Sequence, residues 1–142
     1  WHALEDWGCW TQPGSARLRL PLATPVAEPL RLYLGLVAPA GRAPVTLRLR
    51  ARSTEAWASL ILAPGARQTV FLDIPAGDDD ALTIEIEAAT SQALPGRRRG
   101  QAQRVVGIGV TEVMLCRRED LAARIDFLEH QHFAAAAATP GS

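Results

Sequence analysis

The sequence predicts an all-β fold, an antiparallel and jelly-roll-like β-sandwich of about seven to eight strands with a short C-terminal helix. Three observations predict it. Apolar and polar residues alternate with a period of two through most of the chain, turn-forming residues separate the alternating stretches, and no helical pattern lies between them. A chain of 142 residues is long enough to bury a sizeable core in one such domain.

The strands are predicted from the alternation itself. In "ARLRLPL" (16–22), leucines occupy one face of a strand while Arg17 and Arg19 occupy the other. The connecting segments are rich in the Pro, Gly, Asp and Ser residues that form turns. Strands that follow one another at short spacing favour an antiparallel sandwich. The same alternation recurs at 30–38, 45–51, 57–63, 69–74, 82–88 and 105–115.

The outward strand positions are rich in arginine. We interpret this face as solvated, with charges that discourage pairing between sheet edges, and a polyanion-binding face is the alternative. Fifteen basic residues balance fifteen acidic ones, so the chain has no overall field that would attract nucleic acid or an anionic membrane. Acidic residues such as those at 78–80 are candidate partners for the arginines. The outward arginines are Arg17, Arg19, Arg31, Arg48 and Arg50.

The pattern changes after Cys116. Leu121, Ile125 and Leu128 follow one another at helical spacing within 118–133, which predicts one amphipathic helix. This helix has three possible roles: packing on the sandwich, linking to another domain, or docking on a partner. The predicted organisation is a sandwich domain over 1–116, the helix over 117–133 and a low-complexity tail over 134–142.

The expected location is cytoplasmic. No apolar stretch approaches the roughly 20 residues that span a bilayer, and no signal peptide is recognisable. Because the sequence begins at Trp1, we expect a domain excised from a longer protein. Cys9 and Cys116 match no metal-binding spacing and are expected to be free thiols. A disulfide between them is the alternative if the first and last strands are neighbours.

No motif indicates catalysis, so we expect a non-enzymatic domain without a metal or cofactor. His130 and His132 are two residues apart and therefore face different sides of a helix, which is not the spacing of a helical metal pair. The acidic turn at 78–80 is expected to be a solvated loop, with calcium binding as the alternative. A small hydrolase is a further alternative, and it would require two carboxyl groups facing one another across a cleft.

The tryptophans are the most informative residues. Trp1, Trp7 and Trp10 precede the first regular strand, next to polar side chains that can bond sugar hydroxyls. A tryptophan ring suits both a core and the stacking surface that a sugar ring prefers. For Trp10 a core role is favoured over ligand contact, for Trp7 the two are balanced, and Trp57 is expected in the core. The neighbouring polar candidates are Glu5, Asp6 and Gln12.

The order of these segments resembles the β-sandwich domains attached to bacterial glycosyltransferases and other polysaccharide-assembly proteins. Those domains are similar in outline to carbohydrate-binding modules. The resemblance covers about residues 1–116. It rests on "LEDWGCWTQPGSARLRLPL", with its carboxylate and its "WT" pair, and on "RVVGIGVTEVML", which keeps an arginine followed by an apolar-Gly step at Arg104, Val106 and Gly107.

The chain departs from that pattern just before Arg104. The pattern has an acidic residue there, whereas this chain has Ala102 and Gln103. We therefore expect Arg104 to take Glu5 or Asp6 as its partner, tying the opening segment to the last strand.

The resemblance implies a carbohydrate-binding accessory domain without catalytic activity. Its partners would be an oligo- or polysaccharide and a parent glycosyltransferase domain. The alternative is an assembly module that pairs through an edge strand or the C-terminal helix, for example in a homo-oligomer. The candidate ligand-binding residues are Trp1, Glu5, Asp6, Trp7, Trp10, Gln12 and Arg104.

Overall fold

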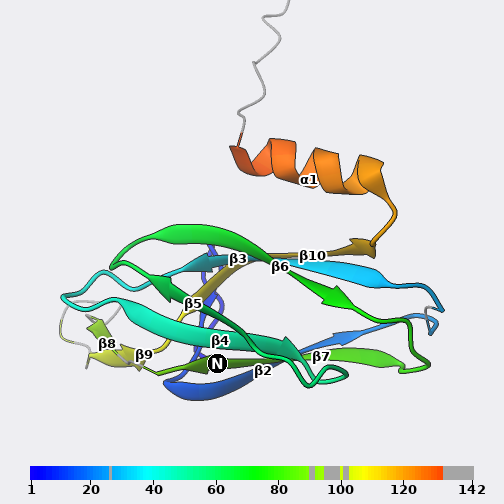
Figure 1. Cartoon of the computed structure of the whole chain (residues 1–142). Coiled ribbons are helices and arrows are strands. Elements are labelled where there is room, and N and C mark those ends of the chain that lie inside the picture. Colours follow the sequence, from blue (N-terminus) through cyan, green and yellow to red (C-terminus); the bar gives the residue numbers. More distant parts are fainter. Residues whose placement is uncertain (26, 90–91, 95–99, 101–102, 133–142) are drawn as a thin grey trace, which may run out of the picture.

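The computed structural model describes residues 1–25, 27–89, 92–94, 100 and 103–132, and within them the fold is an antiparallel β-sandwich with one helix. Two four-stranded sheets face each other (Figure 1). The first sheet has the order β1-β10-β3-β6, the second has the order β2-β7-β4-β5, and β8 pairs with β9 in a small third sheet. The elements are β1 (Cys9–Trp10), β2 (Gly14–Pro21), β3 (Leu30–Val37), β4 (Val45–Ala51), β5 (Ala58–Leu62), β6 (Arg67–Ile74), β7 (Ala81–Ala88), β8 (Gln92–Leu94), β9 (Arg104–Val106), β10 (Gly109–Arg117) and α1 (Leu121–His132).

The core lies between the two large sheets and is made of the inward leucines, isoleucines and valines. In β3 and β4, alternate apolar residues are buried while their neighbours on β4 face outward, as the period-two pattern predicts. Leu34 and Leu49 are completely buried. The largest fully buried apolar side chains are Leu32, Leu34, Leu36, Leu47, Leu49, Ile84, Ile86 and Ile108.

The predicted strands are confirmed, with one division. The stretch predicted as a single strand over 105–115 is two strands, β9 and β10, separated at Gly107 and Ile108. The division arises because Thr11 occupies the gap. Its hydroxyl accepts a hydrogen bond from Ile108 N at 3.0 Å, and its backbone bonds Gly107 N and Ile108 O at 3.0 and 2.8 Å. Strands β1 and β8 are too short to show an alternating pattern and were not expected.

The second sheet carries four of the five outward arginines, and each of these four meets a carboxylate on a neighbouring strand or turn. Arg50 lies directly opposite Glu85, with Nε 2.6 Å from Oε2, and Arg48 lies opposite Glu87 at the same distance. Arg17 contacts the other oxygen of Glu85 at 3.7 Å. Pairing of opposite charges across strands favours the solvated-face interpretation over a polyanion site.

Trp57 corrects one prediction, because it does not lie in the core. It is partly exposed on the outer face of the second sheet, where the guanidinium carbons of Arg48 and Arg50 lie 4.6 and 4.5 Å from its ring centroid. Two stacked cations cover an apolar ring there. Alternation alone could not distinguish this arrangement from burial, since Trp57 precedes β5 and is outside its register.

The acidic turn also meets an arginine. Asp80 Oδ1 lies 3.9 Å from Arg19 Nη2, which is the expected contact between the turn and the outward arginines. Within the described residues, no group of three or more His, Cys, Asp or Glu side chains is arranged to hold a metal ion.

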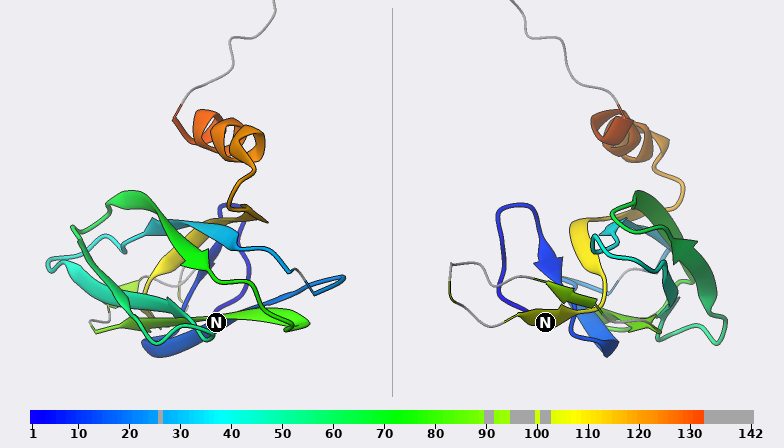
Figure 2. Two further views of the ribbon diagram at one scale, coloured as in Figure 1. Left: turned by 45° about the vertical axis from the view of Figure 1, so that its right-hand side comes forward. Right: turned by 90° about the vertical axis from the view of Figure 1, so that its left-hand side faces the viewer.

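The helix α1 begins where Asp120 caps it, since Asp120 Oδ1 accepts a hydrogen bond from Ala123 N at 3.0 Å. It lies over the outer face of the first sheet (Figure 2). The predicted tail over 134–142 lies outside the described residues. Nothing in the described part of the chain forms a helix with the length and apolar character needed to cross a bilayer.

Both cysteines are free thiols, as expected. Although β1 pairs with β10, Cys9 lies opposite Val110, whereas Cys116 lies near the other end of β10, about 20 Å along the strand at the usual rise per residue. Burial raises the pKa of the Cys116 thiol.

The arginine pairs predict how stability depends on pH. The hydrogen bond from Arg50 holds the pKa of Glu85 below its ordinary value of 4.5. A lowered folded-state pKa contributes stability above the unfolded-state pKa, and that contribution is lost as the pH falls through the folded-state value. We expect Glu85→Gln to lower the midpoint of urea unfolding at pH 7 and to have progressively less effect as the pH falls below this ordinary glutamate value, towards the lower folded-state pKa.

The matched control for this prediction is Glu55→Gln, because Glu55 is exposed in the β4–β5 connection. Its unfolding midpoint should follow that of the wild type at every pH. A Glu85→Gln deficit of equal size at pH 7 and pH 3 would contradict an electrostatic origin.

Candidate functional site

The segment before β2 forms a tight turn that lies against the edge of β10. Glu5 and Gly8 form an antiparallel bridge, with backbone hydrogen bonds of 2.8 and 3.2 Å. Gly8 has a φ of +145°, and a Cβ atom there would collide with the backbone of Val110. The turn therefore requires glycine at this position, and it places Asp6 and Trp7 at its tip.

Glu5 connects this turn to Arg104 and to Trp7. Arg104 Nη1 donates to Glu5 Oε1 at 2.6 Å, and Trp7 Nε1 donates to Glu5 Oε2 at 3.0 Å. The two charged side chains are only 23% and 17% exposed. The expectation that Arg104 pairs with a carboxylate of the opening segment is confirmed, with Glu5 as the partner. Ala102 lies outside the described residues.

Trp10 is a core residue, and this corrects its inclusion among the ligand-binding candidates. It is 9% exposed and packs with Val37 and Val106 in a small second apolar cluster. Trp7 packs against it in a T-shaped arrangement, with ring centroids 4.9 Å apart. A ring with so little exposed surface cannot offer a face to a sugar. Trp10 therefore has the core role that the sequence favoured.

Trp1 and Gln12 lie apart from the cluster around Glu5. Trp1 is 40% exposed, and its Nε1 donates to the backbone oxygen of Arg17 at 2.8 Å, which ties it to β2. Gln12 is exposed. Neither residue lines the groove described next. Among the seven candidates, the structure therefore brings Glu5, Trp7, Trp10 and Arg104 into contact and leaves Asp6 exposed beside Trp7.

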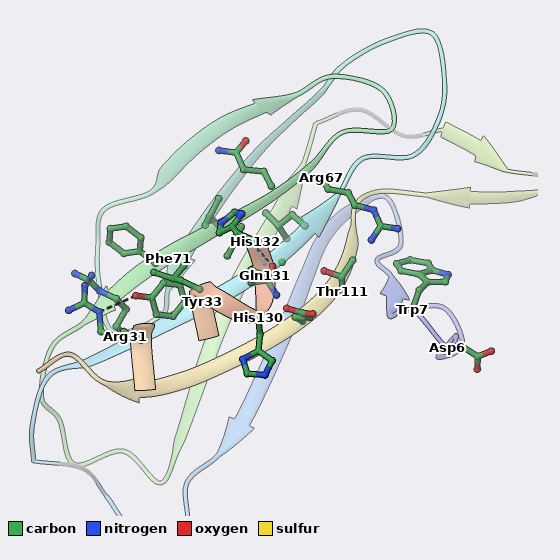
Figure 3. Close-up of a pocket in the computed structure, with 18 residues that line it drawn as sticks. Asp6, Trp7, Arg31, Tyr33, Arg67, Phe71, Thr111, His130, Gln131 and His132 are labelled. Atoms are coloured by element: carbon green, nitrogen blue, oxygen red, sulfur yellow. Dashed lines mark hydrogen bonds between the residues drawn. The ribbon is translucent and has the colours of Figure 1, made fainter. Parts of the chain in front are cut away.

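An open groove with a volume of about 950 Å³ lies between α1 and the outer face of the first sheet. Asp6 and Trp7 lie at one end of it, and Arg31 and Phe71 lie at the other (Figure 3). Polar side chains line the space between them. Two of the seven candidates, Asp6 and Trp7, thus belong to this groove.

The end of the groove near Phe71 is built around Tyr33. Tyr33 is 3% exposed because Phe127 of α1 covers it, with ring centroids 5.2 Å apart. Its hydroxyl accepts a hydrogen bond from Arg124 Nε at 3.1 Å. Together these two contacts hold the middle of α1 on the sheet.

Arg31 is fixed beside this cluster by Asp73. Its Nε and Nη2 donate to the two oxygens of Asp73 at 2.7 and 3.0 Å, and its guanidinium carbon lies 4.2 Å from the ring centroid of Phe71. The same hydrogen bonds raise the pKa of Arg31 and lower that of Asp73. Arg31 therefore stays charged and covers one side of the Phe71 ring.

Most of this groove was not anticipated from the sequence. Tyr33 and Phe71 lie opposite each other on β3 and β6, but nothing in the sequence says which strands become neighbours. The available signal was the alternation of β3, which puts Tyr33 on the same face as Arg31 rather than with the inward leucines. An aromatic residue on an outward face is a reason to expect a covering element, and α1 is that element.

We expect the Glu5–Arg104 pair to hold the Trp7 turn in place. Removing one member leaves the other charge partly buried and unpaired, so Glu5→Gln and Arg104→Met should each lower the free energy of unfolding by roughly 1–3 kcal/mol. The double variant should lose less than the sum of the two, with a coupling of about 1 kcal/mol or more in a double-mutant cycle measured by urea unfolding.

Arg42→Met serves as the control, because Arg42 is exposed in the turn before β4. It should change stability by less than about 0.5 kcal/mol. Strictly additive losses for Glu5→Gln and Arg104→Met would show that the pair does not act as a unit.

Comparisons with protein-family models and with curated proteins gave no match. Among solved structures, the chain is similar to one described as TmCBM61 in complex with beta-1,4-galactotriose, with a TM-score of 0.42 and 10% sequence identity over 76% of this chain and 67% of that chain. A likeness at this TM-score does not indicate what this chain binds.

Proposed function

We propose that this chain is a non-catalytic carbohydrate-binding domain and that a glycan lies in the groove between α1 and the first sheet. The observation that supports this function is the groove itself. Its volume of about 950 Å³ falls within the range of roughly 300–1,000 Å³ that ligand sites occupy. It combines aromatic rings with hydrogen-bonding side chains, which is the combination that a sugar needs.

Trp7 is the proposed stacking residue at the end of the groove nearest the N-terminal turn. Its Nε1 is held by Glu5 and its ring packs against that of Trp10 at an interplanar angle of 65°, so the ring has one fixed orientation before a ligand arrives. A fixed ring loses little conformational entropy on binding, and this favours affinity. Asp6 and Arg67 are exposed beside it and would supply an acceptor and donors for sugar hydroxyls.

Binding is favoured over cleavage by the environment of the carboxylates. Asp6 and Glu112 are the carboxylates among the described lining residues, and both are exposed. Glycoside cleavage needs a general acid whose carboxyl group is partly desolvated, so that it remains protonated near neutral pH. Neither Asp6 nor Glu112 has such an environment.

The proposed context is an accessory domain of a bacterial glycosyltransferase-type protein. Support comes from the two stretches on which the resemblance rests. Glu5 of the first bonds Arg104 of the second, and Thr11 bonds the backbone at Gly107. These stretches therefore form a single structural unit, and the accessory domain would retain a glycan beside the parent enzyme.

The function is tested by titrating the protein with a panel of bacterial and plant oligosaccharides while tryptophan fluorescence is followed. We expect a saturable shift with one class of saccharide. Trp7→Ala should weaken binding roughly three- to tenfold or more, because a stacking contact of about 0.5–1.5 kcal/mol and its oriented surface are lost. Asp6→Ala, which leaves the Trp7–Trp10 packing intact, should weaken binding in the same titration.

Trp57→Ala is the matched control, because Trp57 lies on the outer face of the opposite sheet, stacked against Arg48 and Arg50. Its saccharide response should equal that of the wild type once circular dichroism has shown an intact fold. A broad panel that leaves the fluorescence of the folded wild type unchanged would reject carbohydrate binding.

A second function, assembly through α1, is favoured by a separate observation. Leu121 and Ile125 lie one turn apart on α1 and are 61% and 54% exposed. Large apolar side chains at this spacing form the kind of stripe that packs against a partner helix or a parent domain.

Assembly through α1 predicts a concentration-dependent dimer in analytical ultracentrifugation, because the stripe can pack on that of a second copy. The double variant Leu121→Ser/Ile125→Ser should then be monomeric, while Glu119→Ser, at an exposed position just before the helix, should leave the dimer unchanged. A wild-type protein that stays monomeric over the whole concentration range would contradict self-assembly through this stripe.

A further inference from the structure

Phe71 is a further aromatic ring of the groove, more exposed than Trp7. Phe71 is 53% exposed although Arg31 covers one side of its ring and Tyr33 lies 6.1 Å away, centroid to centroid. Arg31 is itself held by two hydrogen bonds to Asp73, so the ring is supported from behind. Phe71 is therefore an oriented aromatic surface that faces solvent, like Trp7 at the opposite end (Figure 3).

The strand register gives the part of the separation of the two rings that lies along the strands, to which the step across the sheet from β10 to β6 adds. The Trp7 ring lies against Gly109, which pairs with Val37, and Val37 in turn pairs with Arg67. Phe71 lies four residues beyond Arg67 on β6, which corresponds to about 13 Å along the strand. One sugar ring cannot bridge that distance, whereas a short chain of sugars can.

The floor between the two rings is polar and low. The register of β10 with β3 shifts between Val110 and Glu112, so Thr111 is a bulged residue. Gly35 has no side chain, and the Thr111 hydroxyl occupies the space where a Cβ atom would be. Thr69 donates to Gln131 of α1 at 2.9 Å on the other side of the groove. This floor offers donors and acceptors at positions that a chain lying lengthwise would pass.

The charges around the groove balance. Its three guanidinium groups belong to Arg31, Arg67 and Arg124, and its own carboxylates belong to Asp6 and Glu112. Asp73 neutralises Arg31 from outside. The lining guanidinium groups and these carboxylates are equal in number, and Asp73 is also contacted by Arg118 at 3.9 Å, so the groove has no strong field of one sign to attract a highly charged ligand.

We propose that the groove binds an uncharged oligosaccharide lengthwise, with one sugar stacked on Trp7 and another, further along the same chain, stacked on Phe71. The inference rests on the proposed function and adds to it the class of ligand: an extended neutral chain rather than a monosaccharide, a chain end or a polyanion.

The test is a chain-length series of the neutral saccharide class that responds in the panel, from mono- to hexasaccharide, measured by isothermal titration calorimetry. The dissociation constant should fall roughly three- to tenfold once the chain is long enough to reach the second ring, and should then level off. Phe71→Ala should remove that gain for the longer chains and leave the affinity for the disaccharide unchanged. Trp7→Ala should weaken the binding of every length.

Two variants separate stacking from a general loss of structure. Phe71→Tyr keeps a ring and should restore the wild-type dependence on chain length. Ile61→Ala removes another exposed apolar side chain, 67% exposed on β5 and away from the groove, and should have no effect. Thermal unfolding of each variant provides the check on folding.

Other outcomes overturn specific parts of the proposal. An affinity that does not depend on chain length, or that Phe71→Ala leaves unchanged at every length, would reject lengthwise binding while carbohydrate binding still stood. Tighter binding of an acidic oligosaccharide of equal length, weakened by added salt, would reject the uncharged ligand. A lack of response to every saccharide would overturn the proposed function and this inference together.

Discussion

The hydrogen bonds of Thr11 are the interaction on which the arrangement of the groove depends. A buried threonine bonds the backbone at both Gly107 and Ile108, at the point where the chain passes from β9 into β10. Its neighbour Trp10 fills the adjacent apolar cluster. Thr11 itself lies just after the turn that carries Trp7, and its hydrogen bonds therefore fix that turn. Gly107 and Ile108, to which it bonds, come just before β10, which carries the Thr111 bulge and leads into α1. Both walls of the groove are positioned from this one place.

Charge pairing across strands shapes the outer faces of the sandwich. On the second sheet, Glu85 and Glu87 lie opposite Arg50 and Arg48, so a slip by one residue would separate both pairs and expose the apolar face as well. On the first sheet, the pair of Arg31 and Asp73 is used differently, because it supports the ring of Phe71. The same kind of contact thus maintains register on one face and orients an aromatic side chain on the other.

The sequence predicted the sandwich, the six strands β2 to β7, the stretch that forms β9 and β10, and the helix, because those depend on local alternation and on periodicity. The sequence also predicted that Arg104 contacts the opening segment, because this chain lacks the acidic residue that the related pattern has just before the arginine. It misplaced Trp57 and included Trp10 among the ligand candidates, because a tryptophan next to a strand has the same local pattern whether it is buried, stacked on arginines or open to a ligand.

The groove could not be predicted for a different reason. It depends on which strands become neighbours and on where α1 docks, and both are long-range properties. Tyr33 and Phe71 are far apart in the sequence and meet only because β3 pairs with β6. The single-strand prediction over 105–115 failed at Gly107 and Ile108 because the hydrogen bonds that interrupt it come from Thr11, almost a hundred residues earlier.

Because α1 is loosely attached, the wall of the groove that it forms has a lower local stability than the strands of the core. None of its residues is buried, and its described contacts with the sheet are those of Phe127, Arg124 and Gln131. Segments with so few contacts open at a smaller free energy than the core strands do, and their amide protons exchange sooner. A ligand that touches both walls binds only the closed arrangement, so its binding and the ordering of α1 are thermodynamically linked. Protection of the α1 amides against hydrogen exchange is therefore a direct measure of how fully the groove is occupied.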